Sequence, residues 1–255
     1  EDGYQGLIYS RFRVMTPADF SGILTRGGTI LGTSRTPFKR LNIPEADGVE
    51  KVPAMVHTYH KLQLDCLFML GGNGSTKTAN RLREEGLNVI ALPKTIDNDT
   101  WGTEMTFGFT SAIDVATKCI DDIHTTASSH GRVFVIEIMG HKVGWIPLYA
   151  GVAGGADGIR IAKCESAQDV KTVEEHVAAA EREFGVEVGR TLLMAALESP
   201  KGILNAYEIC SASDRMFGVA ISGGDFRKCM QTKFDPSGID MMVARGQMLI
   251  AARAA

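Results

Sequence analysis

The sequence lacks the features of a secreted, membrane-spanning or metal-clustered protein. Its five cysteines include no Cys-x-x-Cys pair and no metal-ligand spacing, a pattern typical of reduced thiols in a cytosolic chain. No apolar run reaches the ~18 residues of a membrane-spanning helix, and no signal-peptide pattern follows Glu1. We therefore expect a cytoplasmic protein with no membrane partner.

An excess of basic charge is also absent. The chain has 27 Lys and Arg against 30 Asp and Glu, a net charge of −3, so we expect no nucleic-acid partner. A small anionic substrate would need locally placed cations. With 255 residues, 44% of them hydrophobic, the chain is long enough for one large domain or two modest ones.

One stretch of the chain has the pattern of a strand, a helix and a second strand. Residues 64–70 form an apolar run that ends in glycine, residues 76–85 are helix-like, and residues 87–92 form a second apolar run. Three elements in this order within a short stretch predict a right-handed βαβ unit, in which the two strands are parallel.

Strand and helix patterns continue to alternate along the rest of the chain. The other predicted helices lie at 49–59, 113–123 and 170–184, and the other predicted strands at 133–138, 191–197 and 217–221. Ser166 and Asp169 have the spacing of a capping box before the helix at 170–184, which Gly185 would end. This alternation predicts an α/β fold with mostly parallel sheets.

A glycine-rich loop, Gly-Gly-Asn-Gly-Ser at 71–75, joins the first strand to its helix. Its three glycines permit positive φ angles and let backbone N–H groups converge on one point, where the helix N-terminus favours an anion. The loop is not a Walker loop, because no Gly-Lys-Ser/Thr follows at the required spacing. An ordinary turn between strand and helix is the alternative interpretation.

A carboxylate loop, Pro-Lys-Thr-Ile-Asp-Asn-Asp at 93–99, follows the second strand. Of its two aspartates, one can accept a proton from an attacking hydroxyl while the other holds Mg²⁺. Lys94 can balance phosphate charge, and Thr95 can donate to a transferring group. A polar turn is the alternative interpretation of this loop on its own.

The two loops are more informative together than apart. Because both follow neighbouring strands of one βαβ unit, we expect them to face the same crevice. A phosphate-binding loop beside an acidic pair is suited to phosphoryl transfer, which depends on positioning, charge neutralisation and a base on the acceptor hydroxyl.

These residues resemble motifs of the phosphofructokinase family. Residues 71–75 are similar to its Gly-Gly-Asp-Gly-Ser donor loop, and residues 93–99 to its catalytic loop. Three further segments, at 31–35 (LGTSR), 132–140 (RVFVIEIMG) and 151–157 (GVAGGAD), resemble other family segments. The resemblance runs from about Glu1 to Ile161.

The resemblance implies two Rossmann-like α/β lobes of the phosphofructokinase type. Residues 1–109 would form the donor-binding lobe and residues 110–200 the sugar-phosphate-binding lobe. Residues 201–255 are unassigned, because the family's Gln-Arg-Gly-Gly segment is not found there. Within them, residues 217–225 (FGVAISGGD) resemble the family's first strand and phosphate loop, which belong to the donor lobe.

The resemblance also implies residue roles. Asp97 would be the general base on the 1-hydroxyl of fructose 6-phosphate, Thr95 would contact the transferred phosphoryl group, and Asp99 would support Mg²⁺ or the sugar. The implied donor-binding residues are Gly72, Asn73, Gly74, Ser75, Arg35, Lys94, Gly223 and Gly224. The implied substrate-binding residues are Arg132, Met139, Gly140 and Glu198. Since the family often binds the 6-phosphate through Arg132 across a subunit interface, a homo-oligomer, dimer or tetramer, is expected.

The sequence departs from the family at two of these motifs. Asn73 and Asp99 are the metal-ligand candidates, but Asn73 stands where the family has an aspartate for Mg²⁺, and an amide is a poorer ligand for a hard cation. Two alternatives are open: Asp99 and the donor phosphates hold the ion, or activity is reduced. His141 stands where the family has arginine. Gly74 goes with ATP in the family, whereas Lys94 is commoner in pyrophosphate users, and we favour ATP because a glycine leaves room for its phosphates.

Four functions stay open from the sequence. ATP-dependent phosphorylation of fructose 6-phosphate, a step of glycolysis, is the leading hypothesis, and the pyrophosphate-dependent reaction is the second. A kinase of another kind with a similar glycine loop, such as an NAD or lipid kinase, is the third. A non-catalytic sensor of sugar phosphate or nucleotide is the fourth, and Asn73 and the missing C-terminal motif motivate it.

Overall fold

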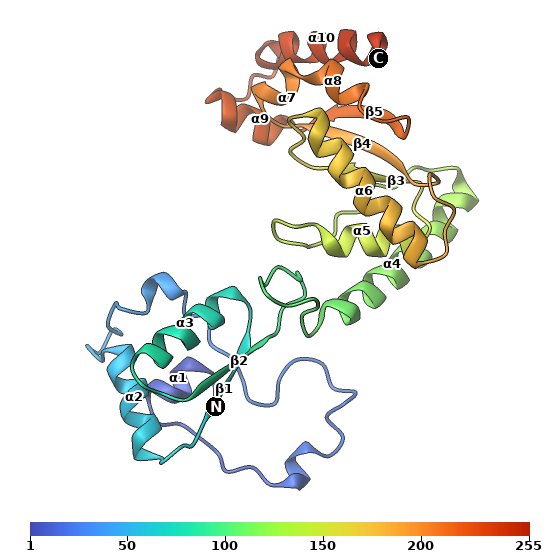
Figure 1. Ribbon diagram of the computed structural model, residues 1–255. Coiled ribbons are helices and arrows are strands. Elements are labelled where there is room, and N and C mark those ends of the chain that lie inside the picture. The colour runs from blue at the N-terminus through green and yellow to red at the C-terminus, as the bar shows by residue number, and fades with distance from the viewer. The chain divides into compact units, whose positions relative to one another are not determined.

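Two parallel sheets, one in each unit of the chain, organise the structure (Figure 1). The computed structural model describes residues 1–255, which divide into a first unit, Glu1–Gly108, and a second unit, Phe109–Ala255. In neither unit is a helix both long and apolar enough to cross a membrane.

The first unit is built around a two-stranded sheet. Its elements are α1 (Tyr4–Ile8), the 3-10 turns η1 (Pro17–Phe20) and η2 (Phe38–Arg40), α2 (Lys51–Lys61), β1 (Leu67–Gly71), α3 (Asn73–Glu84) and β2 (Val89–Pro93). The strands run parallel, with Leu67 opposite Val89 and Gly71 opposite Pro93. The predicted βαβ unit is therefore confirmed.

Apolar residues at helical spacing place α2 and α3 against this sheet. Met55 of α2 and Leu82 of α3 are fully buried, and they share one core cluster with Met69 of β1. Burial of side chains of this size contributes roughly 1.5–3 kcal/mol each, so packing against the sheet stabilises these helices more than helix propensity does. The sheet edge where β1 and β2 end is held by this packing.

The second unit contains a three-stranded sheet in the order β3-β4-β5, with all strands parallel. Its elements are α4 (Phe109–His130), α5 (Trp145–Ala153), β3 (Gly158–Ile161), α6 (Ala167–Glu183), β4 (Leu192–Leu197), α7 (Pro200–Leu204), α8 (Ala206–Cys210), β5 (Met216–Ile221), α9 (Gly223–Met230) and α10 (Ile239–Ala254). Val170 and Val177 of α6 and Leu193 of β4 are fully buried in its core.

The capping box predicted for the helix at 170–184 is present at α6. The Ser166 hydroxyl accepts a hydrogen bond of 3.3 Å from the backbone N–H of Asp169, whose Oδ2 accepts one of 2.9 Å from the N–H of Ser166. The helix ends before Gly185, which has a φ of +68°. Local sequence therefore sets both ends of this helix.

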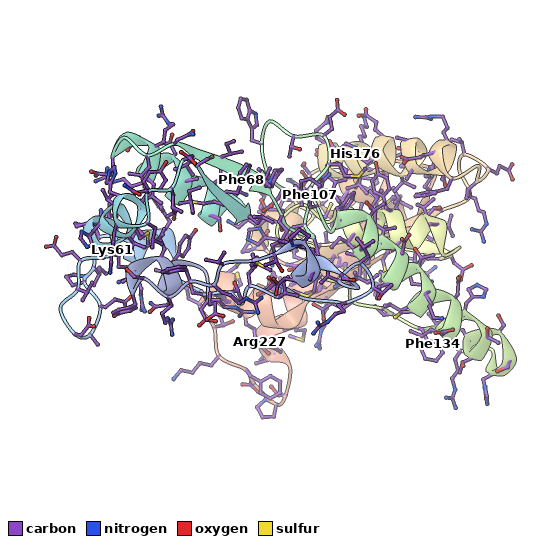
Figure 2. All side chains as sticks on the ribbon, turned by 90° about the horizontal axis from the view of Figure 1, so that it is seen from below. Lys61, Phe68, Phe107, Phe134, His176 and Arg227 are labelled. Atoms are coloured by element: carbon purple, nitrogen blue, oxygen red, sulfur yellow. The ribbon has the colours of Figure 1, made fainter.

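The strand predicted at 133–138 is wrong. Residues 132–140 belong to neither sheet, and the side chains of Val133 and Val135 are 95% and 82% exposed. Figure 2 labels Phe134 of this segment near the end of α4. The apolar run is strand-like in composition, but a strand also needs a neighbour that supplies backbone hydrogen bonds, and no sheet edge does so here.

The strand at 217–221 also lies elsewhere than the resemblance implies. It is β5, paired in parallel with β4, with Leu197 opposite Ile221. Its half-buried Val219 and Ile221 pack against the core of the second unit. Residues 201–255 thus share a unit with residues 109–200. The resemblance implies a place in the donor lobe for residues 217–225 alone.

Candidate functional site

The glycine loop joins β1 directly to α3. Gly71 is the last residue of β1, Gly72 caps the helix and Asn73 is its first residue. None of the three glycines has a positive φ, so the loop does not use the positive φ angles that its glycines permit. A Cβ on Gly71 would lie 2.2 Å from Ser75 Oγ, so glycine is required there for space.

Gly74 has open space around it instead. A Cβ on this residue would meet nothing within 4 Å, and the residue lies in the first turn of α3. The first backbone N–H groups of a helix have no partner inside the helix, and together with the helix dipole they attract anions. The N-terminus of α3 is therefore a suitable place for a phosphate group.

The carboxylate loop begins where β2 ends, and its side chains fold back on one another. The Asp97 N–H donates to Thr95 Oγ1 at 3.3 Å, and Thr95 Oγ1 lies 3.5 Å from Asp97 Oδ2. The carboxylate oxygens of Asp97 and Asp99 lie within 4.8 Å of one another, and both side chains are half-buried. Thr95, Asp97 and Asp99 thus form one compact group.

The two loops meet at the carboxyl edge of the first unit's sheet, as predicted. The Lys94 N–H donates to the Gly71 carbonyl at 2.9 Å, and Asn73 Nδ2 donates to the Asp99 carbonyl at 3.1 Å. A Cβ built on Gly72 would lie 3.5 Å from Thr95 Cβ. The helix start and the acidic group therefore share one side of the sheet.

The donor atoms present fit a magnesium ion. Mg²⁺ prefers oxygen ligands and is commonly held by one or two carboxylates together with substrate phosphates. The carboxylates of Asp97 and Asp99 offer such oxygens. Asn73 retains Oδ1 as an acceptor, because its hydrogen bond to Asp99 uses Nδ2.

Two other predicted donor-site residues, Arg35 and Lys94, have exposed side chains. Arg35 is exposed and follows Ser34, whose hydroxyl accepts a hydrogen bond of 3.1 Å from the Tyr4 N–H. Lys94 is exposed at the start of the carboxylate loop. Donor binding by both side chains stays a prediction.

Three predicted sugar-phosphate residues, Arg132, Met139 and Gly140, lie in the segment 132–140 between α4 and α5. The Arg132 N–H donates to the Ala127 carbonyl at 3.1 Å and so ends α4, while the Met139 side chain is 75% exposed. The Gly140 carbonyl accepts from the N–H groups of Val143 and Gly144, at 3.1 and 3.2 Å, in the turn before α5. Substrate binding by these residues stays a prediction.

Glu198, Gly223 and Gly224 lie together at the carboxyl edge of the second unit's sheet. Glu198 directly follows β4, and the two glycines begin α9, which is separated from β5 by Ser222. Ser222 Oγ donates to Glu198 Oε1 at 3.3 Å. The donor role of the glycines and the substrate role of Glu198 stay predictions.

This edge also holds charged residues that sequence reasoning missed. Lys163, which follows β3, donates to Glu198 Oε2 at 3.0 Å and to Asp225 at the start of α9. Hydrogen bonds to Asp225 and Glu198 raise the pKa of Lys163, and the Lys163 ammonium lowers the pKa of Asp225. The sequence pattern that could have identified these residues is that each one follows a predicted or observed strand closely.

The first unit therefore defines an α/β protein that brings a helix N-terminus and a pair of aspartates to the carboxyl ends of two neighbouring parallel strands. This chain belongs to the phosphofructokinase family, because the family described as "Phosphofructokinase" matches residues 1–226.

Relatives of known name agree with this assignment. The chain is 62% identical to the ATP-dependent 6-phosphofructokinase of Spirochaeta thermophila over 163 residues, which cover 62% of this chain and 44% of that protein. It is 42% identical to the ATP-dependent 6-phosphofructokinase of Propionibacterium freudenreichii subsp. shermanii over 211 residues, which cover 83% of this chain and 55% of that protein. The chain thus spans about half the length of these relatives.

Solved structures extend the similarity to the whole chain. The structure of phosphofructokinase from Saccharomyces cerevisiae matches 99% of this chain and 36% of its own, with a TM-score of 0.57 and 26% identity. That of Pichia pastoris phosphofructokinase in the T-state matches 99% of this chain and 28% of its own, with a TM-score of 0.55 and 26% identity.

Proposed function

We propose that this chain transfers a phosphoryl group from ATP to the 1-hydroxyl of fructose 6-phosphate, giving fructose 1,6-bisphosphate. The observation that carries the proposal is the meeting of the two loops, where Asn73 Nδ2 donates to the Asp99 carbonyl and Gly72 faces Thr95. The names of relatives at up to 62% identity support ATP as the donor.

The proposed mechanism assigns one task to each group. The backbone N–H groups at the start of α3 bind the donor phosphates, and the space beside Gly74 admits them. The Asp97 carboxylate accepts the proton of the sugar 1-hydroxyl as that oxygen attacks the terminal phosphorus. Thr95 Oγ1, held beside Asp97, donates to the transferred group.

Asp99 and Asn73 Oδ1 are the proposed magnesium ligands. When bound, Mg²⁺ neutralises charge on the donor phosphates. The protein's own contribution at this point is to hold the two ligands together, because the Asn73 side chain is hydrogen-bonded to the Asp99 backbone.

A coupled assay with fructose 6-phosphate tests the proposal. We expect product with Mg²⁺ and ATP, and a fall of about 10²–10⁴-fold in kcat for Asp97→Asn, the usual loss when a general base is removed. Asp65→Asn is the matched control, because Asp65 is exposed and precedes β1 at the other end of the strand. Product with pyrophosphate but not ATP would show that pyrophosphate is the donor, in line with the lysine at position 94, which is commoner in pyrophosphate users of the family. Equal activity of Asp97→Asn and the unsubstituted chain would refute the catalytic role of Asp97.

The roles of the second-unit residues are proposed separately. Arg132, Met139, Gly140 and Glu198 are proposed to bind the sugar phosphate, so Arg132→Ala should raise the KM for fructose 6-phosphate more than the KM for ATP. We also propose a homo-oligomer that shares this sugar-phosphate site, which light scattering during gel filtration measures directly.

A cytoplasmic location is proposed as well. All five cysteines are free, which fits a reducing compartment. Cell fractionation with an antibody to the chain would test this location.

A further inference from the structure

The carboxylate loop is held in shape by residues that follow it. The side chain of Thr106 donates from Oγ1 to the Thr95 carbonyl at 2.7 Å. The backbone N–H of the same residue donates to Asn98 Oδ1 at 2.9 Å. The Phe107 N–H donates to the Pro93 carbonyl at 2.9 Å, and Lys94 and Phe107 form a parallel bridge. The segment 103–108 therefore lies beside the loop and forms hydrogen bonds with both its start and its middle.

The burial of Thr106 sets it apart from its neighbours. Its side chain is only 2% exposed, whereas those of Met105 and Phe107 are 55% and 64% exposed. Figure 2 labels Phe107 in this segment. Methionine and phenylalanine are usually buried and threonine is usually exposed. In this segment the threonine is buried and its two apolar neighbours are exposed. In this buried position the Thr106 hydroxyl reaches the Thr95 carbonyl of the loop.

Asn98 is the second fixed point. It has a φ of +50°, a left-handed conformation that asparagine adopts more readily than most residues. Both ends of its side-chain amide are used, since Oδ1 accepts from the Thr106 N–H and Nδ2 donates to the Glu104 carbonyl at 3.4 Å. Because Asn98 lies between Asp97 and Asp99, these bonds fix the backbone on which both carboxylates stand.

We propose that Thr106 is a positioning residue for phosphoryl transfer and that Asn98 is its partner on the loop. Thr106 acts through Thr95, whose carbonyl it holds and whose hydroxyl in turn receives the Asp97 N–H. The effect on catalysis rests on the proposed function. A displacement of about 1 Å at a reacting group can cost on the order of 10²-fold in rate, so loss of these bonds should slow the chemical step.

Two variants of Thr106 separate positioning from packing. Thr106→Val keeps the branched shape and the backbone N–H but removes the hydroxyl donor, which leaves the carbonyl of the half-buried Thr95 without this bond. Thr106→Ser keeps the donor. We expect kcat to fall by 10- to 100-fold in Thr106→Val with the KM values for ATP and fructose 6-phosphate changed little, in line with the cost of displacement. Thr106→Ser should keep most of the activity.

Hydrogen exchange supplies a readout that does not depend on activity. The Asp97 N–H is bonded to Thr95 Oγ1, so exchange in residues 94–99 reports the shape of the loop. We expect faster exchange there in Thr106→Val but not in Thr106→Ser, with exchange in α2 unchanged in both.

The outcomes distinguish this inference from the proposed function. An inactive unsubstituted chain would refute the proposed function, and hydrogen exchange would then decide whether Thr106 holds the loop. If Thr106→Val exchanges in residues 94–99 like the unsubstituted chain, the inference is wrong. It is also wrong if Thr106→Val keeps full kcat, or if its loss appears only in the KM values.

Discussion

The side-chain amide of Asn73 donates a hydrogen bond of 3.1 Å to the backbone carbonyl of Asp99. One residue is the first of α3 and the other follows β2, so the bond joins the two loops of the candidate site across neighbouring strands. An asparagine can make this bond because its amide donates, whereas a carboxylate cannot. The residue at position 73 therefore decides between a link to Asp99 and a second negative charge for a metal.

Replacing Asn73 with aspartate tests that choice. We expect Asn73→Asp to lower the magnesium concentration at half-maximal rate several-fold, because a carboxylate is a better ligand for a hard cation than an amide. Asn73→Ala is the control, since it removes the link to Asp99 without adding a charge, and should raise that concentration. Rates measured over a magnesium titration give both values. The same shift in both variants would show that position 73 has no role as a ligand.

The close approach of Gly71 to Ser75 leads to a prediction about stability. A Cβ on Gly71 would lie 2.6 Å from Ser75 Cβ, which the backbone of α3 holds in place, so the helix start must move in Gly71→Ala. We expect a loss of about 1–3 kcal/mol in the free energy of unfolding, as for other overpacked sites. Denaturation in urea, monitored by circular dichroism, measures it.

Gly74→Ala is the matched control for this variant. It adds the same methyl group three residues later, where nothing lies within 4 Å. Its effect should stay within ~1 kcal/mol, the difference in helix propensity between glycine and alanine. Equal losses in the two variants would mean that crowding at Ser75 does not require Gly71.

Much of the first unit's site was predictable from the sequence. The apolar runs at 64–70 and 87–92 predict two strands, and strands of one βαβ unit end at the same edge of the sheet. The meeting of Gly72 with Thr95 therefore follows from local pattern and topology. The loop's conformation did not follow. Glycine can indicate a left-handed turn or a close contact, and only the position of Ser75 distinguishes them.

The contacts of Lys163 with Glu198 and Asp225 in the second unit could not be predicted from the sequence. Lys163 and Asp225 are separated by 62 positions and meet only because β3, β4 and β5 lie in that order. Strand order depends on which apolar faces pack together, and periodicity along the chain does not contain that information. The prediction of a strand at 133–138 was wrong for the same reason, because an apolar run does not specify which strand it will pair with.

Lys163 should control the titration of Asp225. The ammonium group lowers the pKa of Asp225 chiefly by hydrogen bonding, so Lys163→Met should return that pKa towards the ordinary range of an aspartate. Lys228→Met is the matched control, because the charge of Lys228 also lowers the pKa of Asp225 but has a smaller effect than the contacts of Lys163. Carboxyl chemical shifts followed over pH by NMR measure both. A larger shift in Lys228→Met than in Lys163→Met would contradict the observed contacts.

The ion pair of Glu181 and Arg215 should make the second unit's stability depend on pH. Glu181 is fully buried, and Arg215 Nη1 lies 3.0 Å from each of its carboxylate oxygens. The carboxylate oxygens of Glu181 also accept hydrogen bonds from the backbone N–H groups of Gly189 and Thr191, at 2.9 and 2.8 Å. Burial raises the pKa of Glu181, but these hydrogen bonds outweigh it and hold the pKa below its ordinary value.

The direction of the pH effect follows from that lowered pKa. A carboxyl group whose pKa is lower in the folded chain stabilises it fully above the pKa of the unfolded chain, about 4.3 for glutamate. The stabilisation is lost as the pH falls through the folded pKa. The unfolding free energy should therefore decrease steadily below about pH 4, and Glu181→Gln should remove this part of the decrease.

At neutral pH, the Glu181→Gln variant should lose up to about 3–5 kcal/mol, because the buried Arg215 then keeps only Glu174, 3.5 Å from its Nε, as a charged partner. Glu187→Gln is the control, since Glu187 is exposed on the same connection between α6 and β4 and should change little. Denaturation of all three proteins at pH 3, 5 and 7 separates the effects. A difference between Glu181→Gln and the unsubstituted chain that stays constant over this range would show that Glu181 does not titrate as its contacts require.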